Sequence, residues 1–517
     1  MLQKGLSIAG LLKTDSNTEA QGRLGSRRPI AIIDIGSNSV RQVVYEGLTR
    51  SPSILFNEKI LCGLGKGVAA TGELDPEASA RAIRAVRRFA ILSKQMGVSQ
   101  IHILATAAAR EAKNGEAFLT RVEEVSGKKV SLLTGRQEAE FAAQGIRSGF
   151  HEPVGVAGDL GGGSMELMEI PPESGNGATT PLGGLRLQSE FGDDLAAVRK
   201  HTRKILEGTQ LNWENAPKTF YAVGGTWRSL GRLHMYECDH PMEVVHAYSV
   251  DAKEFRKFCS LIAKGKMDDM VGIDEISSNR RPLLPYGAIV MEETLKFLGV
   301  DALAMSAVGL REGFLYSLLD QKTQEQDALL QATTEFSILR ARSPGHSSEM
   351  GEWTGKAFDT LGIKETASQK RWRVAACNLA DIVWRSASDF RAEQTLGIIN
   401  NAGFNSISHE GRAYLAIATF HRYQGLGVRK KPPKISKLAS EETARQARLL
   451  AALFRVLYLF TAAEEGILPK LKLRKHAKGR FALVVPDEFK DLIGERPMNR
   501  IDQLSRELDA SVTVEII

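Results

Sequence analysis

Cysteine, aromatic residues and long apolar runs are all scarce in this chain of 517 residues. Only four cysteines occur, at positions 62, 238, 259 and 377, and no two of them form a Cys-x-x-Cys pair. Such scattered cysteines exclude a disulfide framework and a closely spaced structural zinc motif, and they favour a reducing compartment. No apolar stretch approaches the roughly 20 residues that span a bilayer, so we expect no membrane span and a cytoplasmic location.

The remaining composition is that of a globular protein with several domains. Hydrophobic residues make up 43% and charged residues 25% of the chain, which excludes extensive disorder and fibrous repeats. At about 100–200 residues per domain, the length predicts three or four domains. The net charge of +7 favours a polyanionic partner without identifying it.

The first half of the chain contains the same strand–turn–strand pattern twice. A strand that ends at Asp34 leads through Gly36-Ser37-Asn38-Ser39 into a returning strand, and about 125 residues later a strand that ends at Asp159 leads through a second glycine turn. Strands that alternate with helices after each hairpin predict α/β domains with mixed sheets. We expect strands near 29–34, 40–46, 53–61, 101–105, 129–133, 153–159, 165–170, 220–223 and 303–308, and helices over 76–96, 136–146 and 289–298.

The second half has long helical patterns from about residue 323 and few strand signals. A Pro-Pro pair among basic residues at 428–437 predicts a linker or an exposed loop. The last segment is expected to be small and α+β, with a helix at 441–465, a hairpin at 471–485, a helix at 499–508 and a strand at 511–517.

The two turns carry the chemistry. Each follows an aspartate, Asp34 or Asp159, at the end of an apolar strand. Glycine and serine let main-chain N–H groups approach an anion closely, and an aspartate at the strand end can hold a divalent cation directly or through water. Either turn alone is more typical of a tight hairpin, in which the glycines serve only to let the backbone turn and bind no ligand. Two such turns from two halves of similar design predict a cleft that grips phosphate from both sides.

The pair of turns resembles the two phosphate loops of the actin-like superfamily. Within that superfamily, Asp34-Ile-Gly-Ser-Asn-Ser39 is most similar to the exopolyphosphatase / guanosine pentaphosphate phosphohydrolase family. The resemblance covers roughly residues 29–320. It is supported by an arginine segment at 105–115, a segment with glutamates at 133–139, a third glycine motif at 223–230 and a closing motif at 306–313.

The resemblance implies a domain order for the whole chain. A flexible tail at 1–28 would precede two tandem actin-like (ribonuclease H-like) α/β domains at 29–150 and 151–322. A mostly helical His-Asp-like domain at 323–427 and a small α+β domain at 428–517 would follow them.

Carried over to this sequence, the resemblance makes Glu138 the general base that activates a water, because a carboxylate can accept a proton from water close to a terminal phosphorus. The family usually has two adjacent glutamates here, whereas this chain has Gln137 and then Glu138. Without the family, Glu138 is more typical of a solvated residue on the first turn of a helix. Arg110 is implied to be a cationic clamp on phosphate oxygens, and its alternative is an interdomain ion pair.

The resemblance also assigns a Mg²⁺ site and a set of phosphate-binding groups. Asp159 and Glu166 would hold the Mg²⁺, and Glu166 would also help to orient the water. Four arginines near motif edges, at positions 41, 228, 280 and 311, are secondary candidates, and the turn at 224–226 is expected to be a structural turn or a wall of the substrate site. The phosphate-binding groups are expected to be Ser37, Asn38, Ser39, Gly161, Gly162, Gly163 and Ser164.

In the C-terminal half, His346, Asp381 and His409 could match ligands of a His-Asp phosphohydrolase domain. Ala380 stands where the histidine of the metal-binding dyad would be, so we expect no independent catalysis there. A basic cluster with Lys470, Lys472, Arg474 and Lys475 is either an exposed loop or part of a channel for polyphosphate, which would bind it by counterion release. The cluster contains no aromatic residue, which argues against a nucleic-acid partner.

Together these residues imply a Mg²⁺-dependent exopolyphosphatase that releases orthophosphate from inorganic polyphosphate as a homodimer. We expect it to be processive, in the sense of holding its product chain. Hydrolysis of guanosine pentaphosphate is the alternative within the family. Two other classes stay open: a kinase that transfers phosphate from ATP to an acceptor, and a sensor that binds without turnover, which the Gln137-Glu138 pair allows.

Overall fold

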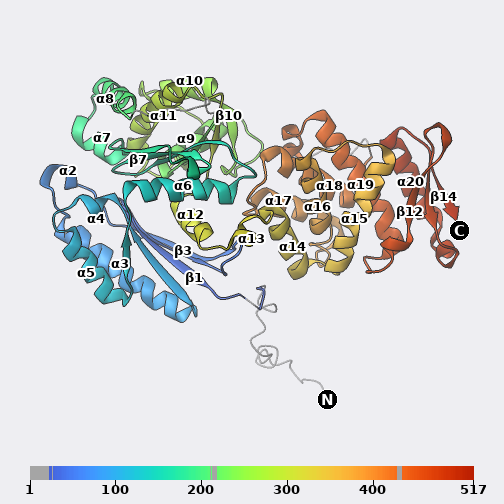
Figure 1. The fold of residues 1–517 in the computed structure, drawn as a ribbon. Coiled ribbons are helices and arrows are strands. Elements are labelled where there is room, and N and C mark those ends of the chain that lie inside the picture. Colours follow the sequence, from blue (N-terminus) through green and yellow to red (C-terminus); the bar gives the residue numbers. More distant parts are fainter. Residues whose placement is uncertain (1–22, 26, 210, 212–217, 428–432) are drawn as a thin grey trace, which may run out of the picture.

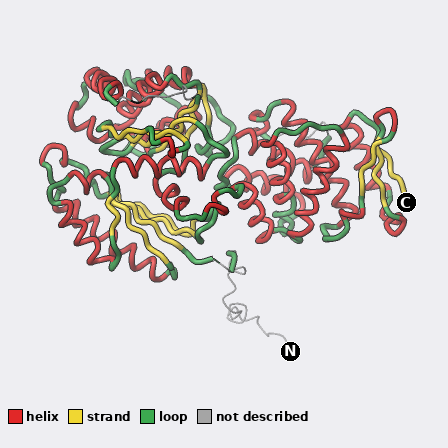
Figure 2. Tube along the Cα trace, viewed as in Figure 1, coloured by secondary structure: helices red, strands yellow, loops and turns green. Residues whose placement is uncertain are grey.

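The computed structural model describes residues 23–25, 27–209, 211, 218–427 and 433–517. Two sheets with their helices form one end of the molecule, and a bundle of helices leads from them to a third, small sheet near the C-terminus (Figures 1 and 2). Most of the tail predicted at 1–28 and residues 428–432 of the predicted linker lie outside the described residues. In the part of the chain that is described, no helix is both long and apolar enough to cross a bilayer.

The first sheet is mixed, as the alternating pattern predicts. Its strands lie in the order β3-β2-β1-β4-β5, with β1 antiparallel to β2 and parallel to β4. The helix α3 begins where the Asp75 side chain accepts a hydrogen bond from the Ala78 N–H at 2.7 Å, a typical N-cap. The elements are β1 (Ile30–Ile35), β2 (Ser39–Tyr45), β3 (Ile54–Leu61), α2 (Val68–Thr71), α3 (Pro76–Gln95), β4 (Gln100–Ala105), α4 (Ala107–Glu111), α5 (Gly115–Ser126), β5 (Val130–Leu132) and α6 (Gly135–Gly149).

The second sheet repeats this plan with strands in the order β10-β11-β9-β6-β7-β8. The predicted hairpin and the central strands are present, whereas β8, β10, α7, α8 and α10 have no counterpart among the predicted elements. The predicted helix at 289–298 begins earlier, at Leu284, because Pro285 suits the first turn of a helix. The elements are β6 (Gly155–Leu160), β7 (Met165–Ile170), β8 (Gly177–Thr180), α7 (Gly184–Phe191), α8 (Leu195–Glu207), β9 (Thr219–Val223), α9 (Gly225–Glu237), β10 (Ser249–Asp251), α10 (Ala252–Ile262), α11 (Leu284–Leu298), β11 (Ala302–Met305) and α12 (Leu310–Ser317).

The helices that close the two halves, α6 and α12, each pack on the sheet of the other half. Ala139, Ala143 and Ile146 of α6 share an apolar cluster with strands of the second sheet, and Leu315 of α12 shares one with strands of the first. The two helices lie against each other between the sheets (Figure 1). Each sheet is therefore covered in part by a helix from the other half of the chain, and this packing joins the two halves.

Glycines allow α6 and α12 to cross at very short range. A Cβ atom built at Gly313 would lie 1.7 Å from the carbonyl oxygen of Phe141, and one at Gly145 would lie 2.4 Å from that of Gly309. A side chain at either position would therefore push the two backbones apart.

The C-terminal half is helical and then α+β, and it shares one apolar core. Buried residues from Leu329 to Val512 belong to a single cluster, so the boundary predicted between 427 and 428 falls inside a shared core. The predicted exposed loop contains Ile435, which is only 1% exposed. The elements are α13 (Gln321–Gln324), α14 (Ala328–Arg340), α15 (Pro344–Leu361), α16 (Ala367–Leu379), α17 (Arg391–Asn401), α18 (His409–Gln424), α19 (Glu441–Thr461), β12 (Lys472–Lys475), β13 (Phe481–Val485), α20 (Glu495–Leu508) and β14 (Val512–Ile516).

Short single turns connect several of these elements. They are the 3-10 turns η1 (Pro172–Ser174), η2 (Ile273–Glu275), η3 (Arg281–Leu283), η4 (Ser388–Phe390), η5 (Lys434–Leu438), η6 (Leu468–Lys470), η7 (Ala477–Gly479) and η8 (Asp487–Leu492). Near the N-terminus, the Arg27 guanidinium forms an ion pair with Glu335 of α14 and lies 3.6 Å from a Glu46 oxygen. This end of the predicted tail is therefore held against the fold.

The crossing of α6 and α12 gives a test of the fold. We expect Gly313→Ala to lower the midpoint of thermal unfolding and to reduce the free energy of unfolding by about 1–3 kcal/mol. The reason is that the added methyl group overpacks the contact between the two helices. The matched control is Gly397→Ala in α17, where a Cβ meets nothing within 4 Å. That change should raise stability by about 0.5–1 kcal/mol, since alanine favours an exposed helix. Equal midpoints for the two variants would contradict the close crossing.

Candidate active site

The two predicted turns have the same backbone geometry. In the first hairpin the Gly36 N–H donates to the Ser39 carbonyl at 3.0 Å, and in the second the Gly161 N–H donates to the Ser164 carbonyl at 2.9 Å. The strand register is equivalent as well, since Asp34 lies opposite Arg41 and Asp159 lies opposite Glu166. The second hairpin thus has a carboxylate where the first has a guanidinium.

The structure brings the two turns together. A Cβ built at Gly162 would lie 3.4 Å from the Cβ of Ser37, and one at Gly163 would lie 3.5 Å from the Ser37 hydroxyl oxygen. Both turns line one cavity of about 240 Å³, hereafter the loop cavity. All seven predicted phosphate-binding residues line it, namely Ser37, Asn38, Ser39, Gly161, Gly162, Gly163 and Ser164.

Glu138 lies on the first turn of α6 and lines the loop cavity. Glu138 is only 7% exposed. It is therefore buried, and the alternative of a solvated residue on the first turn of a helix is wrong. Its neighbour Gln137 has a structural role instead. The Gln137 side chain accepts from the Thr134 N–H at 2.9 Å, and the Gln137 main-chain N–H donates to the Thr134 hydroxyl. This is a capping box, which explains why a glutamine is sufficient at position 137.

Besides Asp34, three carboxylates line the loop cavity, Glu138, Asp159 and Glu166, and we call these three the carboxylate group. Burial raises the pKa of Glu138 to about 7 and that of Asp159 to about 6. Burial and the charge of Glu138 together hold the pKa of Glu166 well above its ordinary value. Burial is the main cause of all three shifts, because it disfavours the charged form of a carboxyl. Repulsion from Asp159 adds to the shift of Glu138, and repulsion from Glu138 adds to that of Glu166.

Arg110 does not line the loop cavity. Its guanidinium forms an ion pair with Glu138 and also donates to the Leu133 carbonyl. The pairing lowers the pKa of Glu138 but does not outweigh the effect of burial. Arg110 therefore contacts the predicted base directly, and its role as a clamp on phosphate stays a prediction.

The loop cavity also contains a cluster of positive charge, of which the sequence analysis named only the arginines, as secondary candidates. Arg41, Lys59, Arg228 and Arg280, hereafter the cation group, line the same cavity. The register of β2 and β3 places Arg41 directly opposite Lys59, an arrangement of like charges that destabilises a sheet.

The cation group is short of compensating charge. Among the described residues none of its members takes part in an ion pair: Arg41 donates to Asn57, Arg228 to the Ala307 carbonyl and Arg280 to the Ser229 hydroxyl. Burial, followed by repulsion from neighbouring arginines, lowers the pKa of Lys59 to about 8 and that of Arg228 to about 10. Unpaired cations in a shared cavity are typical of an anion site.

The fourth arginine among the secondary candidates has a different role. Arg311, at the start of α12, donates to the Asp34 carboxylate at 2.7 Å. The adjacent Glu312 accepts from the Tyr45 hydroxyl at 2.8 Å and from the Gly309 N–H at 2.9 Å. These bonds fix the start of α12 to the first sheet. The Asp34 carboxylate is therefore committed to Arg311.

The donor set of the loop cavity fits a hard divalent cation. Glu166 Oε1 is buried and has no hydrogen-bond partner, and Asp159 lies opposite Glu166 on the neighbouring strand. Mg²⁺ prefers oxygen ligands and needs only one or two carboxylates when phosphate oxygens and water complete its shell. A cation here would also relieve the repulsion within the carboxylate group.

Other predicted residues do not converge on this site. Lys470, Lys472, Arg474 and Lys475 lie on or beside β12, at the far end of the molecule from the two larger sheets (Figure 1). Lys470 pairs with Glu488 at 3.0 Å, and Arg474 pairs with Glu515 at 2.7 Å. They do not line the loop cavity.

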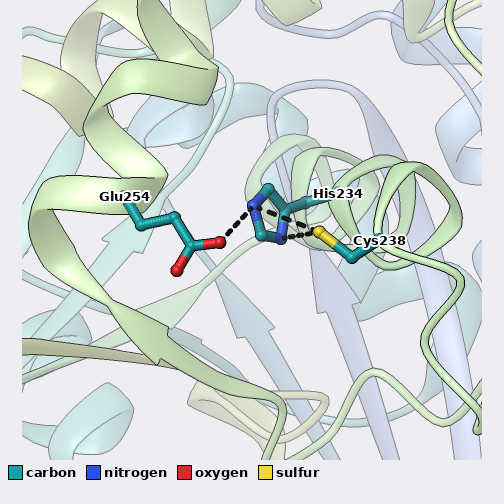
Figure 3. Close-up of side chains that lie close together, drawn as sticks. All are labelled: His234, Cys238 and Glu254. Carbon is teal, nitrogen blue, oxygen red and sulfur yellow. Dashed lines mark hydrogen bonds and ion pairs between the residues drawn. The ribbon is translucent and has the colours of Figure 1, made fainter.

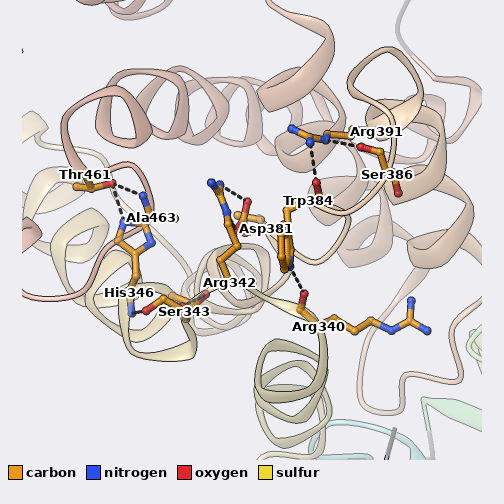
Figure 4. A network of polar contacts seen from close by, with 12 residues as sticks. Arg340, Arg342, Ser343, His346, Asp381, Trp384, Ser386, Arg391, Thr461 and Ala463 are labelled. Atoms are coloured by element: carbon orange, nitrogen blue, oxygen red, sulfur yellow. Dashed lines mark hydrogen bonds and ion pairs between the residues drawn. The ribbon is translucent and has the colours of Figure 1, made fainter. Parts of the chain in front are cut away.

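The possible His-Asp ligands are also apart from one another. Asp381 is bound by Arg342 and by Arg422, with closest distances of 2.6 and 2.9 Å (Figure 4). His346 lies 2.9 Å from the Thr461 hydroxyl, and His409 lies 2.9 Å from His240. Two guanidinium groups thus neutralise Asp381, and no metal cluster forms from these three side chains.

Comparison with known families assigns both halves of the chain. The model of the Ppx/GppA phosphatase family matches residues 43–322, and the model described as "Exopolyphosphatase, C-terminal" matches residues 329–513. The first match ends close to the boundary expected near residue 322, and the second spans the shared C-terminal core.

Individual relatives agree with these matches. Exopolyphosphatase 1 of Mycobacterium bovis is 24% identical over 325 residues, which cover 60% of this chain and 94% of the relative. Retrograde regulation protein 2 of Saccharomyces cerevisiae is 25% identical over 450 residues, 80% of this chain and 75% of the relative. The crystal structure of an exopolyphosphatase from Cytophaga hutchinsonii covers 56% of this chain and 97% of its own, with a TM-score of 0.50 and 22% identity. That likeness supports the actin-like fold of the first half.

Replacing a buried carboxylate of the carboxylate group by an amide should increase the free energy of unfolding, and the increase should depend on pH. In EDTA at pH 8, Glu166→Gln should raise the free energy of unfolding by about 1–3 kcal/mol, because the amide avoids the cost of burying a carboxylate or of holding it protonated above its ordinary pKa. A carboxyl whose folded pKa is raised destabilises the fold above its ordinary pKa of 4.5. The gain should therefore disappear as the pH falls below about 4.5. Thermal unfolding across this range measures it.

The exposed Glu73→Gln is the matched control for Glu166→Gln, and it should show no such trend. A pH-independent difference between Glu166→Gln and the unmodified chain would contradict the raised pKa.

Proposed function

The chain belongs to the Ppx/GppA phosphatase family, a family of phosphoanhydride hydrolases, and on that premise we propose that its substrate is inorganic polyphosphate. It would remove the terminal phosphate as orthophosphate in a Mg²⁺-dependent reaction and would keep the shortened chain bound for the next turn. The observation that carries the proposal is the division of one cavity into two opposed turns with a carboxylate group and an unpaired cation group.

The terminal phosphate fits the space between the two turns. The main-chain N–H groups and hydroxyls of the turns would bind its oxygens, as successive amides do in anion nests. The cation group would hold the next phosphates of the chain, because guanidinium and ammonium groups pair strongly with phosphate oxygens. The repulsion between Arg41 and Lys59 would be relieved when a polyanion lies between them.

In this proposal Glu138 acts as the general base. It would take a proton from a water molecule as the water oxygen forms a bond to the terminal phosphorus and the anhydride P–O bond breaks. The shortened chain would leave with the bridging oxygen. Arg110 would keep the Glu138 carboxylate oriented and favour its ionised form. Asp159 and Glu166 would hold the Mg²⁺, whose charge neutralises the phosphate oxygens.

Guanosine pentaphosphate is the alternative substrate within the family. No aromatic residue is among the described residues that line the loop cavity, so no ring is available there to stack on a base. This favours an inorganic chain over a nucleotide. Orthophosphate release from polyphosphate, guanosine pentaphosphate and ATP, measured side by side with Mg²⁺ or EDTA, separates the two. Release of orthophosphate without an added acceptor would also exclude a kinase, which needs an acceptor, and a sensor, which releases no phosphate.

Glu138→Gln should lower kcat for phosphate release from long-chain polyphosphate by about 10²–10⁴-fold, because the glutamine cannot accept the proton of water. Binding of polyphosphate should change little, since the amide keeps the shape of the side chain. The matched control is Gln137→Glu on the same helical turn, which preserves the capping box and should keep near-normal activity. Near-normal turnover by Glu138→Gln would remove the residue from its proposed role.

The position of the substrate chain can be tested with two sets of neutral variants. The double change Lys59→Gln and Arg280→Gln should reduce kcat/KM about 10–100-fold for tripolyphosphate and for long chains alike, since both place phosphates next to the turns. The change of Lys470, Lys472, Arg474 and Lys475 to glutamine should weaken the binding of long chains far more than that of tripolyphosphate. A loss confined to long chains in the double variant would contradict the proposed place of the cation group.

A further inference from the structure

A histidine, a cysteine and a glutamate meet where α9 ends and α10 begins (Figure 3). His234 and Cys238 are four residues apart, so they lie on the same side of the last turn of α9. Glu254 comes from the first turn of α10. One nitrogen, one sulfur and one carboxylate oxygen from these side chains all lie within 4.8 Å of one another.

The separations are close to those around a tetrahedral metal ion. The Cys238 sulfur lies 3.8 Å from each ring nitrogen of His234, and Glu254 Oε1 lies 3.9 Å from His234 Nε2. Zinc bonds of about 2.0–2.3 Å place tetrahedral ligand atoms roughly 3.3–3.6 Å apart. Because Cys238 and Glu254 are exposed, small side-chain movements can make up the difference.

The imidazole of His234 is already oriented to act as a ligand. It is 4% exposed and packs between the rings of Phe255 and Phe258, with centroid distances of 5.2 and 4.8 Å. Its Nδ1 lies 2.7 Å from the Tyr248 hydroxyl. A hydrogen bond from Nδ1–H to this hydroxyl leaves the Nε2 lone pair for a ligand, which is the usual arrangement behind a metal-bound histidine.

We propose that His234, Cys238 and Glu254 bind one divalent metal ion of the zinc class. Imidazole and thiolate ligands select such borderline ions, whereas Mg²⁺ prefers oxygen alone. The carboxylates of Glu254 and Glu237 place negative charge beside both His234 and Cys238. The C-terminal end of a helix also attracts positive charge. Both effects favour a cation here.

The ion would cross-link α9 to α10, with water in the fourth position. None of its three ligands lines the loop cavity, so the site is separate from the one that hydrolyses phosphoanhydrides. The N-terminal end of α9 does line that cavity through Gly225 and Arg228. The metal would therefore brace the far end of a helix that forms one wall of the active site.

Cobalt substitution tests this site directly. The full-length chain is stripped with EDTA, kept reduced, and titrated with Co²⁺ while the absorption spectrum is recorded. One equivalent should produce a thiolate-to-cobalt charge-transfer band, and Zn²⁺ should displace it whereas Mg²⁺ should not. Zn²⁺ should also raise the midpoint of thermal unfolding, since the three ligands come together only in the folded chain and Zn²⁺ therefore binds that state more tightly.

Single variants identify the ligands. Cys238→Ser should abolish the charge-transfer band, and Glu254→Gln should weaken cobalt binding at least tenfold. Tyr248→Phe should weaken it about 10–100-fold and retain the band, as expected for a residue that orients a ligand. Cys62→Ser, whose thiol lies in the first half of the chain near the Ile60 carbonyl, should behave like the unmodified protein.

A cobalt complex without the band, or a band that survives in Cys238→Ser, would overturn the proposal. Circular dichroism verifies that each variant folds. Phosphate release in Mg²⁺ by Cys238→Ser should equal that of the unmodified chain, so failure of the metal site and failure of the proposed hydrolysis are distinguishable.

Discussion

The loop cavity depends on the close crossing of α6 and α12. Gly145 and Gly313 let the two backbones touch, and each helix begins at the cavity: α6 with Glu138 in its first turn, and α12 with Leu310 and Arg311. Because each helix packs on the opposite sheet, the crossing fixes the distance between the two sheets. That distance sets how closely Ser37 approaches Gly162, and so the size of the anion that fits between the turns.

The charges that line the cavity are incompletely neutralised. The carboxylate group holds its protons to unusually high pH, and Lys59 and Arg228 have lowered pKa values. Among the described residues, the only close ion pairs that involve carboxylates of the cavity are Arg110 with Glu138 and Arg311 with Asp34. A metal cation with a polyanion would supply both missing partners at once, since the cation meets the carboxylates and the phosphates meet the arginines.

Much of this arrangement could be predicted from the sequence, because it is local. The hairpins, the turns and the start of α6 are set by short runs of residues, and the equivalence of Asp34 and Asp159 is visible as a repeated pattern. The cation group could not be predicted as a group. Lys59 becomes a neighbour of Arg41 only through the register of β2 and β3, and Arg280 reaches Gly225 only through the packing of the second half.

The predicted roles of single polar residues depended most on tertiary structure. Arg110 pairs with Glu138 because the last turn of α4 meets the first turn of α6, a contact that the sequence did not predict. Of the basic residues on or beside β12, Lys470 and Arg474 pair with nearby carboxylates, and their place on a substrate path stays a prediction. The homodimer, the cytoplasmic location and the Mg²⁺ requirement stay predictions.

The absence of a Cys-x-x-Cys pair likewise argued against a zinc motif, yet the fold brings Glu254 to a histidine and a cysteine one helical turn apart. Two metal chemistries can then coexist in one half of the protein because their donor atoms differ. The loop cavity offers oxygen alone, which suits an ion that shares its shell with phosphates, whereas a thiolate and an imidazole retain a softer ion in competition with phosphate oxygens. A substrate that chelates Mg²⁺ would therefore recruit that ion to the carboxylates without emptying the site between α9 and α10.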